Sequence, residues 1–282
     1  MSTANLKKMS HSIQLKFLGS GSGDFYITRL RKDISDHRYP TQLLLSQSCL
    51  IDFSSESVYL LKKYDISFDK IKNIFITHSQ LDHFHAPTIC HFATERKKDT
   101  KNPICVWGTE IVRYMLEQEI LLSNTADVVR INTLTPLHRY HFDNVHILPL
   151  PANHLKGGYF SRIGEVSLNY IITIGSDNIL YAVDTGYPEK DILDIWNQYK
   201  FKVVILEATL GDSKEDQSLG HLNFEQSIEI IKQLRANSKI DNKGQVILTH
   251  LNQLHILEEK KTKKRLEKIG IRFAHDGMQI SL

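Results

Sequence analysis

Cysteine is scarce in this chain of 282 residues, and its three copies, Cys49, Cys90 and Cys105, form no Cys-x-x-Cys or Cys-x-Cys pair. This spacing argues against zinc knuckles and a disulfide framework, and it fits a reducing cytoplasm. No apolar run reaches the roughly 18–20 residues that a membrane-spanning helix needs. Residues 1–12 also lack the apolar stretch of a signal peptide. We therefore expect a cytoplasmic protein with no membrane segment and a loose or disordered tail at residues 1–12.

The chain also lacks a strong excess of charge of either sign. It has 35 basic and 32 acidic residues, a net charge of +3, which argues against a protein specialised in nucleic-acid binding. The most basic run, residues 260–265, is interpreted as the solvated face of a helix. The apolar content of 41% is ordinary for a globular protein, and no repeat, linker or low-complexity segment interrupts it. We expect a single domain over residues 13–282.

Strand and helix patterns alternate along the chain, while residues 24–40 suggest a long loop. The strands are expected at residues 13–17, 42–46, 49–53, 71–77, 103–107, 145–150, 167–174, 179–183, 203–206 and 246–248. The helices are expected at residues 55–64, 87–95, 110–119, 189–199, 224–236 and 258–269.

Candidate metal ligands follow directly after one of these apolar strands. His78, Asp82 and His83 come within six positions of its end at residue 77, and His85 lies just beyond them. Imidazole and carboxylate groups are the ligands that zinc and related ions prefer, provided that rigid elements bring them together. A strand that runs straight into such a loop can direct several ligands at one point.

Three further candidates follow strands of the second half. His154 follows the strand at 145–150, Asp184 follows the strand at 179–183, and His250 ends the segment VILTH. Any one of these residues is more often structural than functional. Because all of them follow strands in the same way, we expect them to meet the first group at one metal site.

These residues give the chain a resemblance to the metallo-β-lactamase superfamily of binuclear hydrolases, through His78-x-x-x-Asp82-His83 followed by His154, Asp184 and His250. The resemblance implies an α+β fold, a four-layer αββα sandwich with metals at the strand ends. Within the superfamily the chain is most similar to the branch of phosphoribosyl cyclic phosphate phosphodiesterase and the ribonuclease Z-like enzymes. The supporting segments are LGSGS at 18–22, LIDF at 50–53, LPLPANH at 148–154, GHLN at 220–223, ILTH at 247–250 and HDGM at 275–278.

The resemblance implies a site for two divalent metal ions, Zn, Mn or Fe. It places His78 and His154 at the first ion and Asp82, His83 and His250 at the second, with Asp184 bridging the two. His221 and Asp82 are the implied catalytic residues. His221 matches the branch's proton donor to the leaving group, and a histidine suits that role because its pKa lies near working pH. The alternative for His221 is a structural residue at the start of a helix.

The chain departs from the superfamily motif at Gln80, where the family carries a second histidine. Gln80 could ligate through its amide oxygen, a weaker donor than imidazole, or the first site could be empty or loosely held. His85 is a third option as a substitute ligand. Residues 24–41 contain no cysteine, so the structural zinc of the cyclic phosphodiesterase is not expected. The long arm of ribonuclease Z is not apparent either, which disfavours tRNA processing.

The expected function is metal-dependent hydrolysis of a small cyclic or nucleotide-like phosphodiester by a hydroxide that bridges the metals. The alternatives are another hydrolase on the same fold, such as a lactonase, β-lactamase or thioesterase, or a binding or regulatory protein that has lost a metal. Fold alone does not separate these. The expected partner is a small-molecule substrate rather than a nucleic acid or a membrane, and analogy with the fold suggests a homodimer.

Overall fold

The computed structural model describes residues 14–32, 37–96, 102–142, 144–154, 164–214 and 220–282. The tail expected at residues 1–12 lies outside the described residues. Two seven-stranded sheets form the centre of the molecule.

The first sheet has the strand order β14-β1-β2-β3-β4-β5-β6. Its N-terminal part is antiparallel, because β1 pairs with β2 and with β14, and β2 pairs with β3 in a hairpin. From β3 to β6 the pairing is parallel. The strands are β1 (Gln14–Gly19), β2 (Gln42–Leu45), β3 (Cys49–Ile51), β4 (Asn73–Phe75), β5 (Ile104–Gly108), β6 (Val129–Thr133) and β14 (Gln279–Ser281).

The second sheet has the order β13-β12-β11-β10-β9-β8-β7. Here β7 to β10 are antiparallel and β10 to β13 are parallel. The carboxyl ends of β10, β11 and β12 therefore lie at the same edge of the sheet. The strands are β7 (Tyr140–Phe142), β8 (Val145–Pro151), β9 (Leu168–Ile174), β10 (Asp177–Ala182), β11 (Phe201–Glu207), β12 (Ile240–Thr249) and β13 (Ile271–Phe273).

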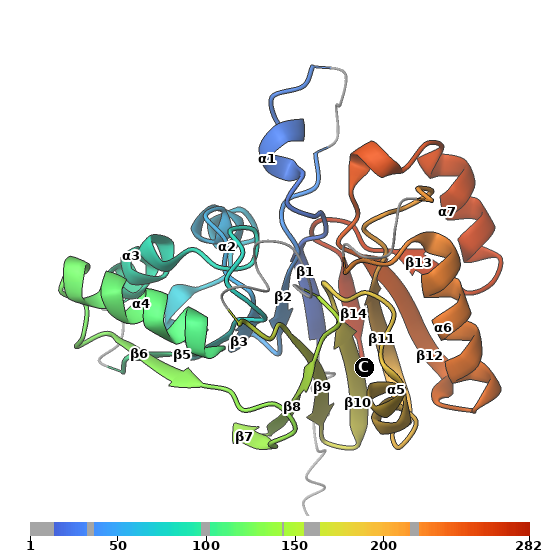
Figure 1. Cartoon of the computed structure of the whole chain (residues 1–282). Helices are drawn as coiled ribbons and strands as arrows, with labels where there is room; N and C mark the ends of the chain where they lie inside the picture. Colours follow the sequence, from blue (N-terminus) through green and yellow to red (C-terminus); the bar gives the residue numbers. More distant parts are fainter. Residues whose placement is uncertain (1–13, 33–36, 97–101, 143, 155–163, 215–219) are drawn as a thin grey trace, which may run out of the picture.

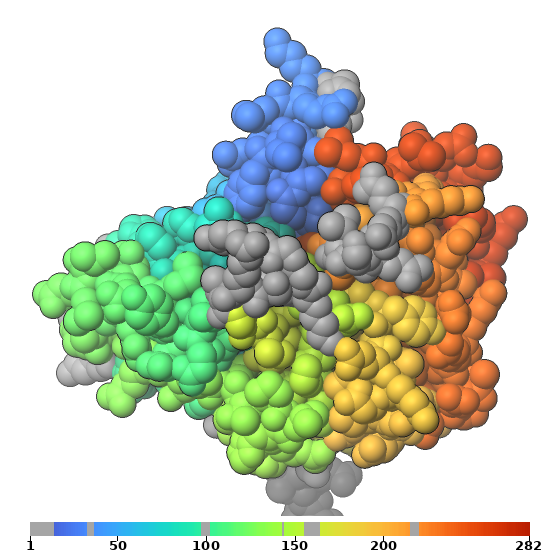
Figure 2. Space-filling view, in the orientation of Figure 1, coloured from blue at the N-terminus to red at the C-terminus, as the bar shows by residue number. Residues whose placement is uncertain are grey.

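Helices cover both outer faces of the paired sheets (Figure 1). α2, α3 and α4 lie on one side and α5, α6 and α7 on the other, while the segment with α1 projects beyond the body in both views (Figures 1 and 2). No helix among the described residues is both long and apolar enough to cross a lipid bilayer. The helices are α1 (Phe25–Thr28), α2 (Ser57–Lys63), α3 (Ala86–Arg96), α4 (Glu110–Ser123), α5 (Lys190–Trp196), α6 (Phe224–Ala236) and α7 (Glu259–Glu267), with short 3-10 turns at Phe68–Lys70 and Gln253–His255.

The apolar side chains of each central strand divide between two cores. In β4, Phe75 points into the core between the sheets, while Ile74 packs under the helices of the first layer. In β9, Ile172 points into the core between the sheets and Ile171 into the core under the helices of the last layer. Because successive side chains of a strand face opposite ways, a strand buried on both faces reads as a continuous apolar run. The expected αββα sandwich is confirmed.

The four strands that sequence analysis did not predict are the four sheet edges. β14 and β6 flank the first sheet, and β13 and β7 flank the second. An edge strand pairs on one side only and is often short or polar, so its apolar pattern is weak. The loop expected at residues 24–40 also contains the short helix α1.

The core between the sheets predicts a large loss of stability on truncation of Ile172, a fully buried side chain in β9. We expect Ile172→Ala to lower the free energy of unfolding by about 2–5 kcal/mol, through lost burial and the cavity left behind. Leu122→Ala is the matched control, because Leu122 is 83% exposed and its truncation should change stability by less than about 0.5 kcal/mol. Urea unfolding measures both, and equal midpoints would contradict the assigned core.

Candidate metal centre

The site is built at strand ends where the backbone turns sharply. Asp52 follows β3, Asp184 follows β10 and His250 follows β12, with φ angles of 64°, 51° and 55°. Few residues other than glycine adopt this left-handed region, although Asp and His do so more readily than most. Such backbone conformations cost of order 1–3 kcal/mol each and concentrate at functional sites. At Asp52, Asp184 and His250 this conformation turns the backbone away from the strand, while the side chain stays close to the other side chains of the site.

The structure brings the sequence-predicted ligands together. Residues that could share a cation form three overlapping groups of buried or half-buried side chains, all of which include Asp184. His85 lies outside these groups, because its ring Nδ1 is 2.7 Å from the Thr88 hydroxyl at the start of α3. The groups are Asp82, His83, Asp184 and His250; His78, His154 and Asp184; and Asp184, Glu207, His221 and His250.

The first of these groups has the geometry of a closed metal cluster. Asp82 Oδ2 lies 3.3 Å from His83 Nε2 and 3.4 Å from His250 Nε2. The two imidazole nitrogens are 3.2 Å apart, and Asp184 Oδ2 lies 2.6 Å from His83 Nε2. Ligand atoms about 2.0–2.2 Å from one tetrahedral ion stand about 3.3–3.6 Å from each other. Three of these four separations match that spacing to within about 0.1 Å, and the fourth is shorter.

Gln80 completes the other cluster. Its Oε1 lies 2.9 Å from His78 Nε2 and 3.2 Å from His154 Nε2, and Asp184 Oδ2 lies 3.3 Å from His78 Nε2. The amide oxygen thus occupies the position that a third ligand would take. Of the options for Gln80, the geometry fits an amide-oxygen ligand.

Asp184 faces both clusters with oxygens that have no hydrogen-bond donor. Both carboxylate oxygens are buried and receive no bond of acceptable geometry from the described residues. Buried polar atoms normally have a partner. Oδ2 lies close to His78 of one cluster and His83 of the other, so its unshared lone pairs fit a carboxylate that bridges two cations.

Hydrogen bonds to Nδ1 orient the imidazoles that come from the first sheet. His83 Nδ1 donates to Asp52 Oδ2 at 2.8 Å. Thr77 donates its hydroxyl proton to Asp52 Oδ1, so the same hydroxyl is free to accept from His78 Nδ1 at 3.0 Å. With their protons on Nδ1, both rings present the lone pair of Nε2 to the clusters, as metal-binding histidines do.

The imidazoles from the second sheet are oriented in the same way. His154 Nδ1 donates to the Gly220 carbonyl at 3.0 Å. A carbonyl only accepts, so the proton of His154 is on Nδ1. Gly220 has a φ of 71°, and a Cβ there would lie 3.2 Å from His154 Nδ1, so this close approach requires glycine. His250 Nδ1 lies 2.8 Å from the hydroxyl of Thr209, which donates its own proton to Glu207.

The two clusters differ in how readily their histidines carry positive charge. Burial lowers the pKa of His78 well below its usual range. Burial also opposes protonation of His250, but the Asp184 carboxylate outweighs it and raises the pKa of His250 to about 10. Burial would likewise raise the pKa of Asp184, yet His250 and His83 hold it well below its usual range. These carboxylates stabilise positive charge beside them, which suits a cation.

His221 stands at the edge of the clusters with a carboxylate behind it. Its Nδ1 lies 3.1 Å from Glu207 Oε1 and 3.4 Å from Asp184 Oδ1, and its side chain is 19% exposed. Burial opposes protonation of His221, but Glu207 more than offsets it and raises the pKa. Its ring centroid is 4.7 Å from that of His154. His221 is therefore a half-buried titratable group at the edge of the clusters.

Sequence analysis missed Asp52 and Glu207. Both are fully buried, and Glu207 accepts from the backbone N–H groups of Thr185, Thr209 and Leu222. Asp184 was predicted because it follows an apolar strand. The same pattern would have identified Asp52 and Glu207, because each lies at the end of an apolar strand. Asp52 lies outside the three groups and orients His83, whereas Glu207 belongs to the third group and contacts His221.

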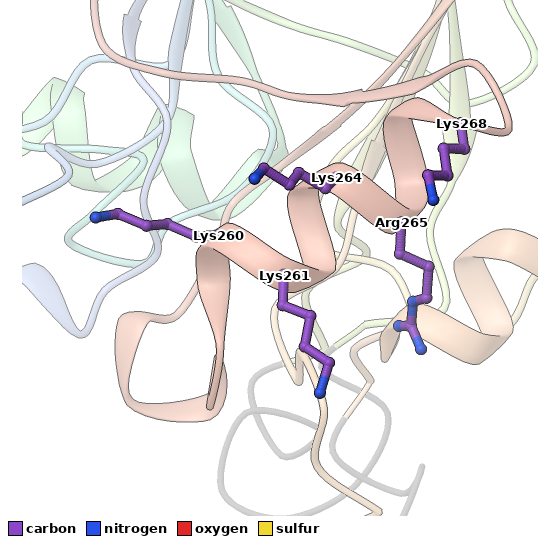
Figure 3. Close-up of a pocket in the computed structure, with 5 residues that line it drawn as sticks. All are labelled: Lys260, Lys261, Lys264, Arg265 and Lys268. Atoms are coloured by element: carbon purple, nitrogen blue, oxygen red, sulfur yellow. The ribbon is translucent and has the colours of Figure 1, made fainter.

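The basic run lies apart from the clusters. Lys260, Lys261, Lys264, Arg265 and Lys268 project from α7 and line a surface hollow that shares no residue with the metal centre (Figure 3). All five are exposed, which agrees with a solvated helix face.

Comparison with known proteins extends over most of the chain. A family model described as a beta-lactamase superfamily domain matches residues 50–251. No curated protein gives a significant match.

Solved structures with the same fold share little sequence with this chain. The metallo-beta-lactamase fold protein YhfI from Bacillus subtilis has a TM-score of 0.73 and 16% identity over 96% of this chain and 100% of that chain. A diphosphatase from the PhnP family has a TM-score of 0.73 and 18% identity, with coverage of 96% and 98%. Zn²⁺-bound PqqB from Methylobacterium extorquens has a TM-score of 0.72 and 14% identity, with coverage of 95% and 100%.

At these identities the structures show the fold, and the family match covers the segments that supply every residue of the clusters. The clusters themselves are buried sets of His and Asp side chains that suit divalent ions such as zinc. The chain therefore belongs to the beta-lactamase superfamily, as a hydrolase of the metallo-β-lactamase fold.

Proposed function

We propose that the protein is a binuclear metal-dependent phosphodiesterase that cleaves a small cyclic or nucleotide-like phosphodiester. The observation that carries this proposal is His221 with Glu207, a proton donor beside both ligand clusters. Phosphodiester hydrolysis requires a proton for the leaving alkoxide, and a histidine so placed can supply it. One structural relative is a diphosphatase, which is consistent with phosphoester chemistry.

The proposed ligands divide between two ions. His78, Gln80 and His154 would hold the first, and Asp82, His83 and His250 the second, with Asp184 shared. Ions bound by these residues would supply charge neutralisation for the phosphoryl group and a water of lowered pKa.

The remaining residues prepare the site for this chemistry. Glu207 accepts from His221 Nδ1, which fixes the ring and leaves Nε2 to hold the proton destined for the leaving oxygen. Asp52 fixes His83, and Gly220 fixes His154. His78, His83, His154 and His250 are at most 4% exposed, whereas His221 is 19% exposed, so we expect the substrate to approach from the side of His221.

Metal analysis and a substrate panel test the proposal together. Protein purified without chelator should contain two equivalents of Zn, Mn or Fe, and should hydrolyse bis-p-nitrophenyl phosphate or cyclic nucleotides. Less than half an equivalent, without recovery on added metal, would instead support a binding or regulatory protein. Hydrolysis of a lactone, thioester or cephalosporin without activity on phosphodiesters would replace the proposal with one of the other hydrolases.

Replacement of His221 separates proton donation from metal binding. We expect His221→Ala to lower kcat by about 10²–10⁴-fold on a cyclic nucleotide, whose alkoxide needs a proton. The loss should be much smaller on bis-p-nitrophenyl phosphate, because its leaving group needs none. His91→Ala is the control, since His91 is exposed on α3. Equal losses on both substrates, or loss of bound metal, would contradict the role as proton donor.

Gln80 is tested by restoring the imidazole that the superfamily motif carries. Gln80→His should raise metal affinity at the first cluster, because imidazole is a stronger donor than an amide oxygen, and Gln80→Ala should lower it. Gln198→His, at an exposed position, controls for the added histidine. Competition with a chelator measures the affinities. Unchanged affinity and stoichiometry in both Gln80 variants would show that Gln80 is not a ligand.

A further inference from the structure

A buried carboxylate stands behind the loop that carries His78 and Gln80. Glu165 precedes β9 and is 7% exposed. Its Oε1 accepts from the Ser79 backbone N–H at 3.0 Å and from the Thr109 hydroxyl at 2.6 Å. Its Oε2 accepts from the Ser79 hydroxyl at 2.5 Å. Both oxygens therefore bind the one residue that lies between two proposed ligands.

The same segment fastens the end of β4 to the second sheet. The Leu168 N–H donates to the Thr77 carbonyl at 3.0 Å, and the Tyr170 hydroxyl donates to the Ile76 carbonyl at 2.9 Å. Residues 165–170 thus hold residues 76–79 at three successive points. The third contact is made by Glu165, which accepts hydrogen bonds from both the backbone and the side chain of Ser79.

Burial of the Glu165 carboxylate has an energetic cost, and its contacts with the ligand loop suggest what the protein gains in return. The partners of Glu165 among the described residues are neutral donors. A buried charge with neutral partners is costly. A neutral amide oxygen is also a weak metal ligand, with a flexible side chain that must be ordered to bind. A rigid loop removes part of that ordering cost, because a ligand held in place binds more tightly than a mobile one.

We propose that Glu165 is a positioning residue for the first metal cluster. By clamping Ser79 it holds Gln80 Oε1 between the imidazoles of His78 and His154, and so compensates for the weaker ligand at position 80. This inference rests on the proposed two-ion site, but it does not depend on which substrate is cleaved.

Glu165→Gln tests the clamp with little change in volume. The Ser79 N–H and hydroxyl donate to different oxygens of Glu165; a carboxamide replaces one of these oxygens with an NH₂ group and removes the negative charge, so the present pair of donated bonds is lost. We expect affinity at the first cluster to fall by about 10–100-fold, as for other groups that orient metal ligands, with affinity at the second cluster unchanged. Two-step titration of metal-stripped protein with Co²⁺, followed by its visible spectrum and by chelator competition, measures each site without using activity.

Two further variants keep the test decisive. Glu110→Gln removes a carboxylate next to Thr109 whose side chain is 65% exposed, and it should leave both affinities as in the wild type. Ser79→Ala removes one bond of the clamp and should weaken the first site less than Glu165→Gln does. It also replaces Glu165→Gln if that variant does not fold.

The outcomes separate this inference from the proposed function. Wild-type affinity at both sites in Glu165→Gln and Ser79→Ala would overturn it, and so would parallel losses at both sites with a lower Tm, which indicate a merely structural role. A wild-type protein that binds one ion would also overturn it. Two ions without phosphodiester hydrolysis would reject the proposed function and leave the clamp standing.

Discussion

The structure depends on the convergence of imidazole Nε2 atoms and carboxylate oxygens in a buried space. Four histidines carry their protons on Nδ1 and direct Nε2 inward, where they meet Asp82, Asp184 and the Gln80 oxygen. Carboxylates so close together repel one another unless positive charge lies between them. A cation resolves this repulsion. The strained backbone at the strand ends and the hydrogen bonds to Nδ1 both serve this convergence.

The metal centre spans the two sheets. Residues 78–83 follow β4 of the first sheet, whereas His154, Asp184 and His250 follow β8, β10 and β12 of the second. The distances between ligands therefore depend on how the sheets are held against each other. The apolar core between them sets this spacing overall, and the bonds from residues 165–170 to residues 76–79 set it locally. Packing between the sheets therefore affects the distances between the proposed metal ligands.

Gln80 distinguishes this chain from the superfamily motif, and its geometry does not support loss of the first cluster. The amide oxygen stands where a ligand is needed, with an imidazole on either side. A neutral, flexible ligand binds less tightly than imidazole, so its surroundings matter more. Beside the clusters, His221 contacts the buried Glu207 carboxylate, and the proposed proton donation rests on this pair. These two features together favour a working hydrolase over a binding protein.

The sequence by itself determined the fold class, the central strands and the candidate ligands, because buried strands leave apolar runs and each candidate follows such a run. The four edge strands escaped prediction, since pairing on one side leaves little apolar pattern. Only the tertiary structure decided that Gln80 stands between two imidazoles while His85 turns to Thr88. It also revealed Asp52, Glu207 and Glu165 behind the site. Local spacing specifies which residues follow a strand, but contacts between distant segments depend on backbone turns and on the packing of one sheet against the other, which sequence spacing does not encode.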